Sequence, residues 1–182
     1  SPPPPPAVGS DSRPNILLYI VDTLRADALG PYRGDPKQTP EIGKFARDAI
    51  VFENAFAQSS WTRASVASIL TSQYPRAHGA EDRGDRLAGT AQLISETLTE
   101  HGYYTGLITT NPNVGAFFGF DQGFETYIKP RVGAERARIA RKNPSGAYLQ
   151  GTDEDLLDSA IEYLDVYGHE RFFLYLHMMD LH

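Results

Sequence analysis

Residues 15–22 read Asn-Ile-Leu-Leu-Tyr-Ile-Val-Asp, a nearly continuous apolar run that ends in a carboxylate. Runs of this kind are typical of strands that are covered on both faces, as in parallel sheets. Asp22 then stands at the C-terminal edge of the strand, where α/β proteins bind their ligands. The run therefore predicts a buried strand that carries Asp22 to a functional edge of a sheet.

Helical and strand-like segments alternate along the rest of the chain. Helices are expected to begin near residues 39, 65, 90 and 152, where capping residues or apolar stripes of helical period occur. The stripe of the last helix is expected to contain Leu156, Leu157, Ala160, Ile161 and Leu164. Further strands are expected over 50–56, 103–109 and 172–177. This alternation predicts an α/β sandwich with a largely parallel central sheet.

Composition narrows the classes of function. The chain has 182 residues, a net charge of −6 and no cysteine. An acidic balance argues against nucleic acid as the main partner, and the absence of cysteine excludes disulfides and thiolate chemistry. The longest strong apolar run, 16–21, is far too short to span a bilayer, so no transmembrane segment is expected in this chain.

The two ends of the chain lead to expectations about its organisation. Residues 1–13 form a Pro-rich leader, read either as a spacer behind a removed signal peptide or as an ordinary disordered tail. The first reading predicts an extracytoplasmic protein, periplasmic or secreted. The chain stops just after an expected strand, at Asp180 and His182, where α/β sites are usually built. Residues 14–182 are therefore expected to be the N-terminal portion of a catalytic domain that is truncated here.

Two residues are candidates for chemistry from position alone. Asp22 offers the oxygen that a hard divalent cation prefers, although an Asp can also cap the following turn. Thr62 lies in the segment SSWTRASVASILTS, just before the expected helix, whose free N–H groups would stabilise an anion. The competing interpretation is that Thr62 is only a helix cap, since threonine is a preferred capping residue.

Other polar residues give weaker signals. Asp27 and Arg25 are most simply a turn residue and a surface ion pair. His78 lies in a loop that contains Pro and Gly, where a solvated histidine is the common case. His177 fits a core histidine at a strand end. The basic segment 129–142 is most simply a solvated surface, with attraction of anionic substrates or lipid headgroups as the alternative.

Taken in order, the motifs of this chain resemble those of sulfatase-like hydrolases of the alkaline phosphatase superfamily. The resemblance covers about residues 14–182 and rests on the order and spacing of several short matches. They are Pro14-Asn-Ile-Leu-Leu with Asp22-Thr-Leu-Arg-Ala-Asp27, Thr39-Pro40, Phe52-Glu-Asn-Ala-Phe56, Thr62 to Thr71, Tyr74-Pro75 with His78-Gly79, Gly102-Tyr103, Gly119 to Phe124, and His177 with Asp180-Leu-His182.

The resemblance implies an alkaline-phosphatase-like fold and a set of roles. Asp22 would bind a divalent metal (Ca, Mn, Zn or Mg), and Thr62 would be the nucleophile as well as a metal contact. His182 would act at the substrate as proton donor or oxyanion contact. Asp180, His177 and Asn111 would lie beside the substrate. The remaining metal ligands would come from a later, C-terminal part of the domain, which this chain does not contain.

Departures from the family pattern indicate which ester is cleaved. Sulfatases oxidise a Cys or Ser at the position of Thr62 to formylglycine, whereas oxidation of threonine would give a ketone, so no formylglycine is expected. The second Asp of the usual pair is Thr23. A threonine nucleophile resembles the branch that cleaves or transfers phosphoesters, with a small anionic ester or a lipid headgroup as substrate. The alternatives are a catalytically inactive anion-binding or scaffold protein and a simple phosphate-binding module.

Overall fold

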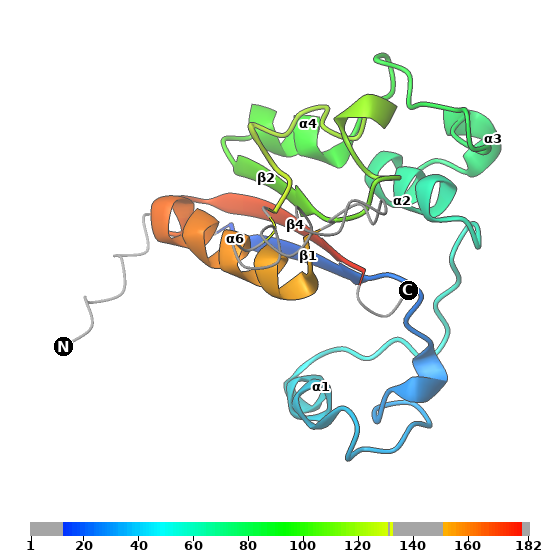
Figure 1. Cartoon of the computed structure of the whole chain (residues 1–182), viewed down its shortest axis with the longest axis vertical. Helices are drawn as coiled ribbons and strands as arrows, with labels where there is room; N and C mark the ends of the chain where they lie inside the picture. The colour runs from blue at the N-terminus through cyan, green and yellow to red at the C-terminus, as the bar shows by residue number, and fades with distance from the viewer. Residues whose placement is uncertain (1–12, 131, 133–150, 180–182) are drawn as a thin grey trace, which may run out of the picture.

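The computed structural model describes residues 13–130, 132 and 151–179. Its centre is a four-stranded sheet in the order β1-β4-β2-β3, in which every neighbouring pair is parallel. The strands are β1 (Ile16–Val21), β2 (Tyr104–Thr109), β3 (Thr126–Ile128) and β4 (Phe172–Met178). β4, the last strand in sequence, thus lies between β1 and β2 (Figure 1). The expected parallel α/β architecture is confirmed.

Helices cover both faces of this sheet. α6 (Asp153–Tyr167) contacts β2 and β4 on one face, and α4 (Ile94–Glu100) contacts β2 on the other. α2 (Thr62–Thr71) packs against α3 (Pro75–His78) and α4, and together they lie across the sheet from α6 (Figure 1). The described chain is therefore a three-layer arrangement, in which α2 stands over the face that will carry the site.

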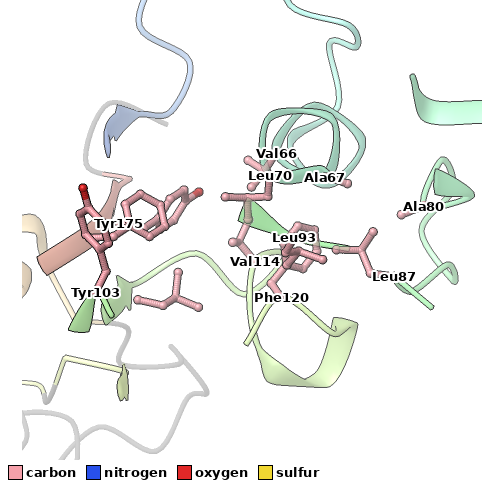
Figure 2. Close-up of a cluster of buried hydrophobic side chains, with 12 residues drawn as sticks. Val66, Ala67, Leu70, Ala80, Leu87, Leu93, Tyr103, Val114, Phe120 and Tyr175 are labelled. Carbon is pink, nitrogen blue, oxygen red and sulfur yellow. The ribbon is translucent and has the colours of Figure 1, made fainter. Parts of the chain in front are cut away.

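Two apolar clusters hold the layers together. The larger lies between the sheet and the layer of α2 and α4, where side chains from α2 meet Leu93, Val114 and Phe120 (Figure 2). Phe173 and Tyr175 of β4 complete it from the sheet side. The smaller cluster joins β2 and β4 to α6 through Leu156, Ala160 and other buried residues. Since successive residues of β4 alternate between the clusters, both faces of this central strand are apolar, as its sequence predicts.

Short elements fill the connections. These are the 3-10 turns η1 (Ala26–Ala28), η2 (Ala46–Asp48) and η3 (Ala116–Phe118), and the helix α1 (Pro40–Phe45). α1 begins at Pro40, as its sequence predicts, but the Thr39 hydroxyl accepts a hydrogen bond from Gly30 N–H and caps nothing. α1 lies to one side of the sheet (Figure 1), and Phe45 at its end is 77 % exposed.

Some sequence predictions about individual elements are wrong. Residues 50–56 form no strand, because the described sheet offers that segment no partner, and Ile50, Phe52 and Phe56 are exposed. The apolar stripe of α6 is rotated from the expected one. Leu156 and Ala160 are buried together with Tyr163, whereas the remaining residues expected in the stripe are partly exposed: Leu157, Ile161 and Leu164.

Other elements follow the sequence closely. β1, β2 and β4 occupy the predicted segments, and the Thr152 hydroxyl caps α6 by accepting from Asp155 N–H. The prediction that β1 is covered on both faces is wrong, because β1 is an edge strand of the described sheet and its Leu17 and Tyr19 are exposed. β3 and α3 were not expected. Among the described residues no helix is both long and apolar enough to cross a membrane. Most of the basic segment 129–142 lies outside the described residues.

The first prediction concerns the close approach of α6 to the sheet at Gly106. A Cβ on Gly106 would lie 2.7 Å from Tyr163 Cε2 and 3.1 Å from Leu174 Cδ1. Gly106→Ala is therefore expected to lower the free energy of unfolding by about 1–3 kcal/mol, because the ring must move. The midpoint of denaturant unfolding measures the loss.

Gly43→Ala is the matched control for this substitution. Gly43 lies within α1, and an added Cβ there would meet no atom within 4 Å. Its replacement is expected to be neutral or to stabilise by up to about 1 kcal/mol, since alanine favours a helix. Equal midpoints for the two variants would show that the contact between α6 and β2 is looser than described.

Candidate functional site

The register of the parallel sheet brings three polar side chains together. His177 in β4 pairs with Ile20 of β1 on one side and with Thr109 of β2 on the other. Asp22 and Asn111 each follow those partners by two residues, so their side chains point to the same face as His177. The backbone N–H of Asp22 continues the ladder by donating to Met178 O at 3.0 Å. Three strand ends thus deliver a carboxylate, an amide and an imidazole to one corner.

α2 adds a hydroxyl to this corner. Thr62 is the first residue of α2, and the N-cap position belongs to Trp61, which makes no side-chain capping bond. The Thr62 hydroxyl instead donates to Asp22 Oδ2 at 3.1 Å. The interpretation of Thr62 as a simple helix cap is therefore wrong. Segments about forty residues apart in sequence meet at this hydrogen bond, as the sequence analysis expected of the catalytic pair.

A single oxygen, Asp22 Oδ2, is the centre of the arrangement. Besides Thr62 it contacts Asn111 Nδ2 at 2.7 Å and His177 Nε2 at 3.2 Å. The Asp22 side chain is only 11 % exposed. Among the described residues no Lys or Arg lies within ion-pair distance of it, and His177 is its sole ionisable partner. A largely buried carboxylate held by neutral donors is an electrostatically attractive place for a cation.

Asn111 is fixed as a hydrogen-bond donor toward Asp22. Its Oδ1 accepts from Asn113 N–H at 2.9 Å, and its own backbone N–H donates to Thr109 Oγ1 at 2.9 Å. The amide oxygen therefore faces its own loop, and Nδ2 faces Asp22. This orientation makes Asn111 a group that positions the carboxylate. The expectation that it contacts substrate stays a prediction.

His177 connects the corner to the core. Its Nδ1 lies 2.8 Å from the hydroxyl of Tyr175, which is fully buried, and its own side chain is 1 % exposed. Burial lowers the pKa of His177, although the negative charge of Asp22 opposes this shift. Burial also raises the pKa of the Tyr175 phenol well above its usual value. Both rings are therefore neutral near pH 7, and the hydroxyl fixes the orientation of the imidazole.

The residue after Asp22 has a strained backbone. Thr23 has a φ of 58°, in the left-handed region that β-branched residues rarely adopt. Such conformations cost about 1–3 kcal/mol and cluster at functional sites. Here the turn at Thr23 ends β1 abruptly, so that Asp22 remains at the edge of the sheet.

Arg63, which the sequence analysis did not single out, anchors the start of α2. It is 2 % exposed, and its guanidinium donates to the carbonyl oxygens of Asp82, Arg83 and Asp85. The guanidinium also stacks on the Phe118 ring, 3.4 Å from the ring centroid. The one feature of the sequence that could have pointed to Arg63 is its position directly after Thr62. The contacts tie the N-terminal end of α2, where Thr62 lies, to the loop that contains residues 82–85.

His78 is a structural residue and not the solvated loop histidine that the sequence suggested. It is buried, its Nδ1 accepts from Ala80 N–H at 3.1 Å, and its Nε2 lies 3.1 Å from Ser68 Oγ. Because Nδ1 accepts, Nε2 carries the proton and donates to Ser68. This bond ties the end of α3 to α2. Burial lowers the pKa of His78.

The remaining expected residues lie elsewhere. Arg25 forms the surface ion pair that was expected of it, and its partner is Asp27, which was expected only to be a turn residue. Asp180 and His182 lie outside the described residues, so their roles stay predictions. Among the residues that the structure describes, no group of three or more His, Asp or Glu side chains is assembled for a metal.

The described corner nevertheless contains ligand types that suit a divalent cation. A carboxylate oxygen, a hydroxyl oxygen and an imidazole nitrogen are ligand types found around divalent cations in proteins. Among the described residues, the Asp22 carboxylate is bonded to hydroxyl, amide and imidazole groups and to no Lys or Arg. Asp22 and Thr62, the predicted metal residues, are placed next to each other. The donor set therefore fits a divalent cation whose shell is completed by further ligands.

Comparison with known proteins identifies the family. The family model described as Sulfatase matches residues 14–182. The chain belongs to the sulfatase family. It is 30 % identical over 109 residues to the N-acetylglucosamine-6-O-sulfatase of Bacteroides thetaiotaomicron, covering 60 % of this chain and 20 % of that protein. It is 33 % identical over 97 residues to the arylsulfatase of Clostridium perfringens, covering 53 % of this chain and 20 % of that protein.

Solved structures share the fold. A protein in complex with its substrate D-glucosamine-2-N,6-O-disulfate matches with a TM-score of 0.71 and 23 % identity, over 91 % of this chain and 34 % of that one. The phosphonate monoester hydrolase of Agrobacterium radiobacter matches at 0.70 and 19 %, over 93 % and 41 %. The C-terminal periplasmic domain of EcEptC from Escherichia coli, in complex with Zn, matches at 0.67 and 16 %, over 98 % and 48 %.

These matches delimit what the chain represents. It spans about a fifth of the length of the two curated relatives. The fold is that of the alkaline phosphatase superfamily, partly covered. The structural matches are all under 25 % identical, so they establish the architecture of this sulfatase-family chain and leave its substrate to be inferred from its own residues.

A second prediction concerns the pH dependence of the buried histidines. Burial lowers the pKa of His78 and His177 in the folded state. Below the pKa of a free histidine, the unfolded chain therefore binds more protons than the native state does. The free energy of unfolding should therefore fall as the pH drops below about 6.5, by at most about 1.4 kcal/mol per pH unit for each histidine. Denaturant unfolding at a series of pH values measures this.

His78→Gln tests the His78 part of this effect. The variant loses one titrating group, so its stability should decline less steeply between about pH 6.5 and 5 than that of the wild type. His101→Gln, at an exposed position, controls for the chemical change. A decline in His78→Gln as steep as in the wild type would show that His78 is protonated in the native state.

Proposed function

We propose that this sulfatase-family protein is a metal-dependent hydrolase or transferase that acts on phosphoester substrates with Thr62 as nucleophile. The observation that carries the proposal is the 3.1 Å hydrogen bond from the Thr62 hydroxyl to Asp22 Oδ2. It holds a nucleophile at the start of a helix and beside a carboxylate that fits a divalent cation. This is the arrangement that nucleophilic attack on an anionic ester requires.

The residues of the chain have separate tasks in the reaction. Thr62 Oγ attacks phosphorus in line, and its proton leaves along the hydrogen bond to Asp22. The P–O bond to Thr62 forms as the bond to the leaving oxygen breaks, and His182 is predicted to protonate that oxygen. Water or an acceptor alcohol then attacks the phospho-threonine and releases Thr62. The cation, when bound, lowers the pKa of the Thr62 hydroxyl and neutralises charge on the transferred group.

The backbone at the start of α2 contributes to the same charge balance. α2 is ten residues long, and its first N–H groups lie where Thr62 begins the helix. These groups and the positive end of the helix favour the negative charge that develops on the transferred phosphoryl group. Because Arg63 and His78 fix α2 in place, these dipoles need no reorganisation during the reaction.

The chemistry of Thr62 favours phosphorus over sulfur. Oxidation of a threonine hydroxyl gives a ketone, and a ketone lacks the aldehyde hydrate that sulfatases use. Thr62 therefore acts as a plain alcohol. The curated relatives named above are sulfatases, and a sulfate ester is accordingly the second substrate class for this chain.

The third prediction tests the nucleophile in the full-length protein supplied with divalent cations. Thr62→Ala is expected to lower turnover of the preferred ester by roughly 10³-fold or more, because no oxygen remains to attack. Thr62→Ser should retain part of the activity. Assays with phosphate monoester, diester, phosphonate and aryl sulfate substrates, together with mass spectrometry of Thr62, identify the ester and any covalent adduct.

Thr71→Ala is the matched control in the same helix. Thr71 ends α2, and its hydroxyl donates to Ala67 O, away from Asp22. This variant should retain turnover. If no cation-dependent turnover is found with any of these esters, the protein is the inactive anion-binding or scaffold form. Preference for aryl sulfate would overturn the choice of phosphorus.

A further inference from the structure

We propose that His177 binds the divalent cation of this site through Nε2, and that the Tyr175 hydroxyl holds the imidazole in its ligating tautomer. This inference rests on the proposed function only in placing a cation beside Asp22. It assigns to His177 a role other than the substrate contact that the sequence suggests. It also gives Tyr175, which no motif points to, a positioning role.

The first argument is the spacing of the three polar atoms. Asp22 Oδ2 lies 3.1 Å from Thr62 Oγ1 and 3.2 Å from His177 Nε2. Two ligands that each lie about 2.0–2.1 Å from a tetrahedral cation are separated by about 3.3–3.4 Å. The atoms are therefore spaced as neighbours in one coordination shell. Hydrogen bonds span the same distances, so the orientation of Asn111 and the partner of His177 Nδ1 decide between the two interpretations.

The second argument is the contrast between His177 and Asn111. Asn111 must donate through Nδ2, because Asn113 N–H holds its oxygen at 2.9 Å. An amide nitrogen has no lone pair available for a cation, so Asn111 cannot serve as a ligand in this orientation. His177 has no such restriction, because either ring nitrogen can carry the proton. It presents Nε2 to the same oxygen, and that nitrogen can become a ligand.

The third argument is the partner of the other ring nitrogen. Tyr175 OH lies 2.8 Å from His177 Nδ1 and is buried beneath it. A hydroxyl both donates and accepts. Without a cation, Tyr175 donates to Nδ1, and Nε2–H donates to Asp22. With a cation bound at Nε2, the ring proton lies on Nδ1 and the imidazole stays neutral. The Tyr175 oxygen then accepts a hydrogen bond from Nδ1–H. Histidine ligands commonly have an outer partner of this kind.

The donor set also specifies the class of cation. Ca²⁺ and Mg²⁺ prefer shells made of oxygen alone. A shell with one imidazole nitrogen beside a carboxylate and a hydroxyl suits Zn²⁺ or Mn²⁺ better. The inference therefore narrows the four cations expected from the sequence to a first-row transition ion, with Zn²⁺ as the probe of choice.

The fourth prediction is measured by cation binding without substrate. The full-length protein is stripped with a chelator and titrated with Zn²⁺ or Ca²⁺ against a chromophoric competitor. Tyr175→Phe is expected to weaken Zn²⁺ binding by roughly 10- to 100-fold, and His177→Gln at least as much. Ca²⁺ affinity should change less. Wild-type Zn²⁺ affinity in folded His177→Gln would overturn the assignment.

Two matched controls separate ligation from packing. His101→Gln removes an exposed histidine outside the site, and Tyr163→Phe removes a buried tyrosine hydroxyl that donates to Tyr104 O on the α6 side. Both should bind Zn²⁺ like the wild type. Zn²⁺ affinity that falls equally in the controls and in the site variants would show a general packing effect and contradict the inference.

A measurement on the wild type covers the case in which the variants do not fold. The ¹⁵N resonances of the His177 ring should show an unprotonated Nε2 and a protonated Nδ1 at saturating Zn²⁺. An Nε2–H tautomer in the saturated protein would overturn the assignment. Because no substrate is present, the result is independent of the proposed function. Cation-dependent turnover without ligation by His177 would overturn only the assignment of His177 as a ligand. Ligation by His177 without turnover would overturn only the proposed function.

Discussion

The site depends on the register of β4 between its two parallel neighbours. His177 pairs with Ile20 on one side and Thr109 on the other, and Asp22 and Asn111 follow two residues later. A slip of one residue in either pairing would turn the affected side chain toward α6. The corner would then lose its carboxylate or its amide. Since the strands are continuous apolar runs, the packing of both clusters against β4 must select the register that function requires.

The position of α2 is the second constraint, because the hydroxyl that contacts Asp22 comes from Thr62 on this helix and not from the sheet. Arg63 fixes the start of the helix through three carbonyl oxygens, and His78 fixes its middle through Ser68. Both are buried polar anchors, which contribute modestly to stability but define one geometry well. Together with the apolar packing, these anchors hold α2 where the Thr62 hydroxyl lies within hydrogen-bonding distance of Asp22.

The sequence predicts the architecture better than the details of the site. β2 and β4 can be predicted because buried parallel strands are continuous apolar runs, and Thr152 predicts the start of α6 because its cap is local. The apolar run of β1 also predicts a strand, although one face of β1 is exposed at the edge of the described sheet. The meeting of Asp22 with Thr62 follows from placing both at the same edge. Register is not readable, because it depends on packing between distant segments. For the same reason the burial of His78 and the absence of a strand at 50–56 were missed.

The turn at Thr23 links this geometry to the chemistry of the cation. A threonine at a φ of 58° is strained, whereas Asp or Asn tolerates the left-handed region better. The chain nevertheless has a hydroxyl residue where the resemblance to sulfatases leads one to expect a second carboxylate. Among the described residues, Asp22 is therefore the one carboxylate that contacts Thr62. For the cation proposed at this corner, less negative charge would make neutral ligands more important, and coordination by His177 Nε2 would shift the preference toward ions that bind nitrogen.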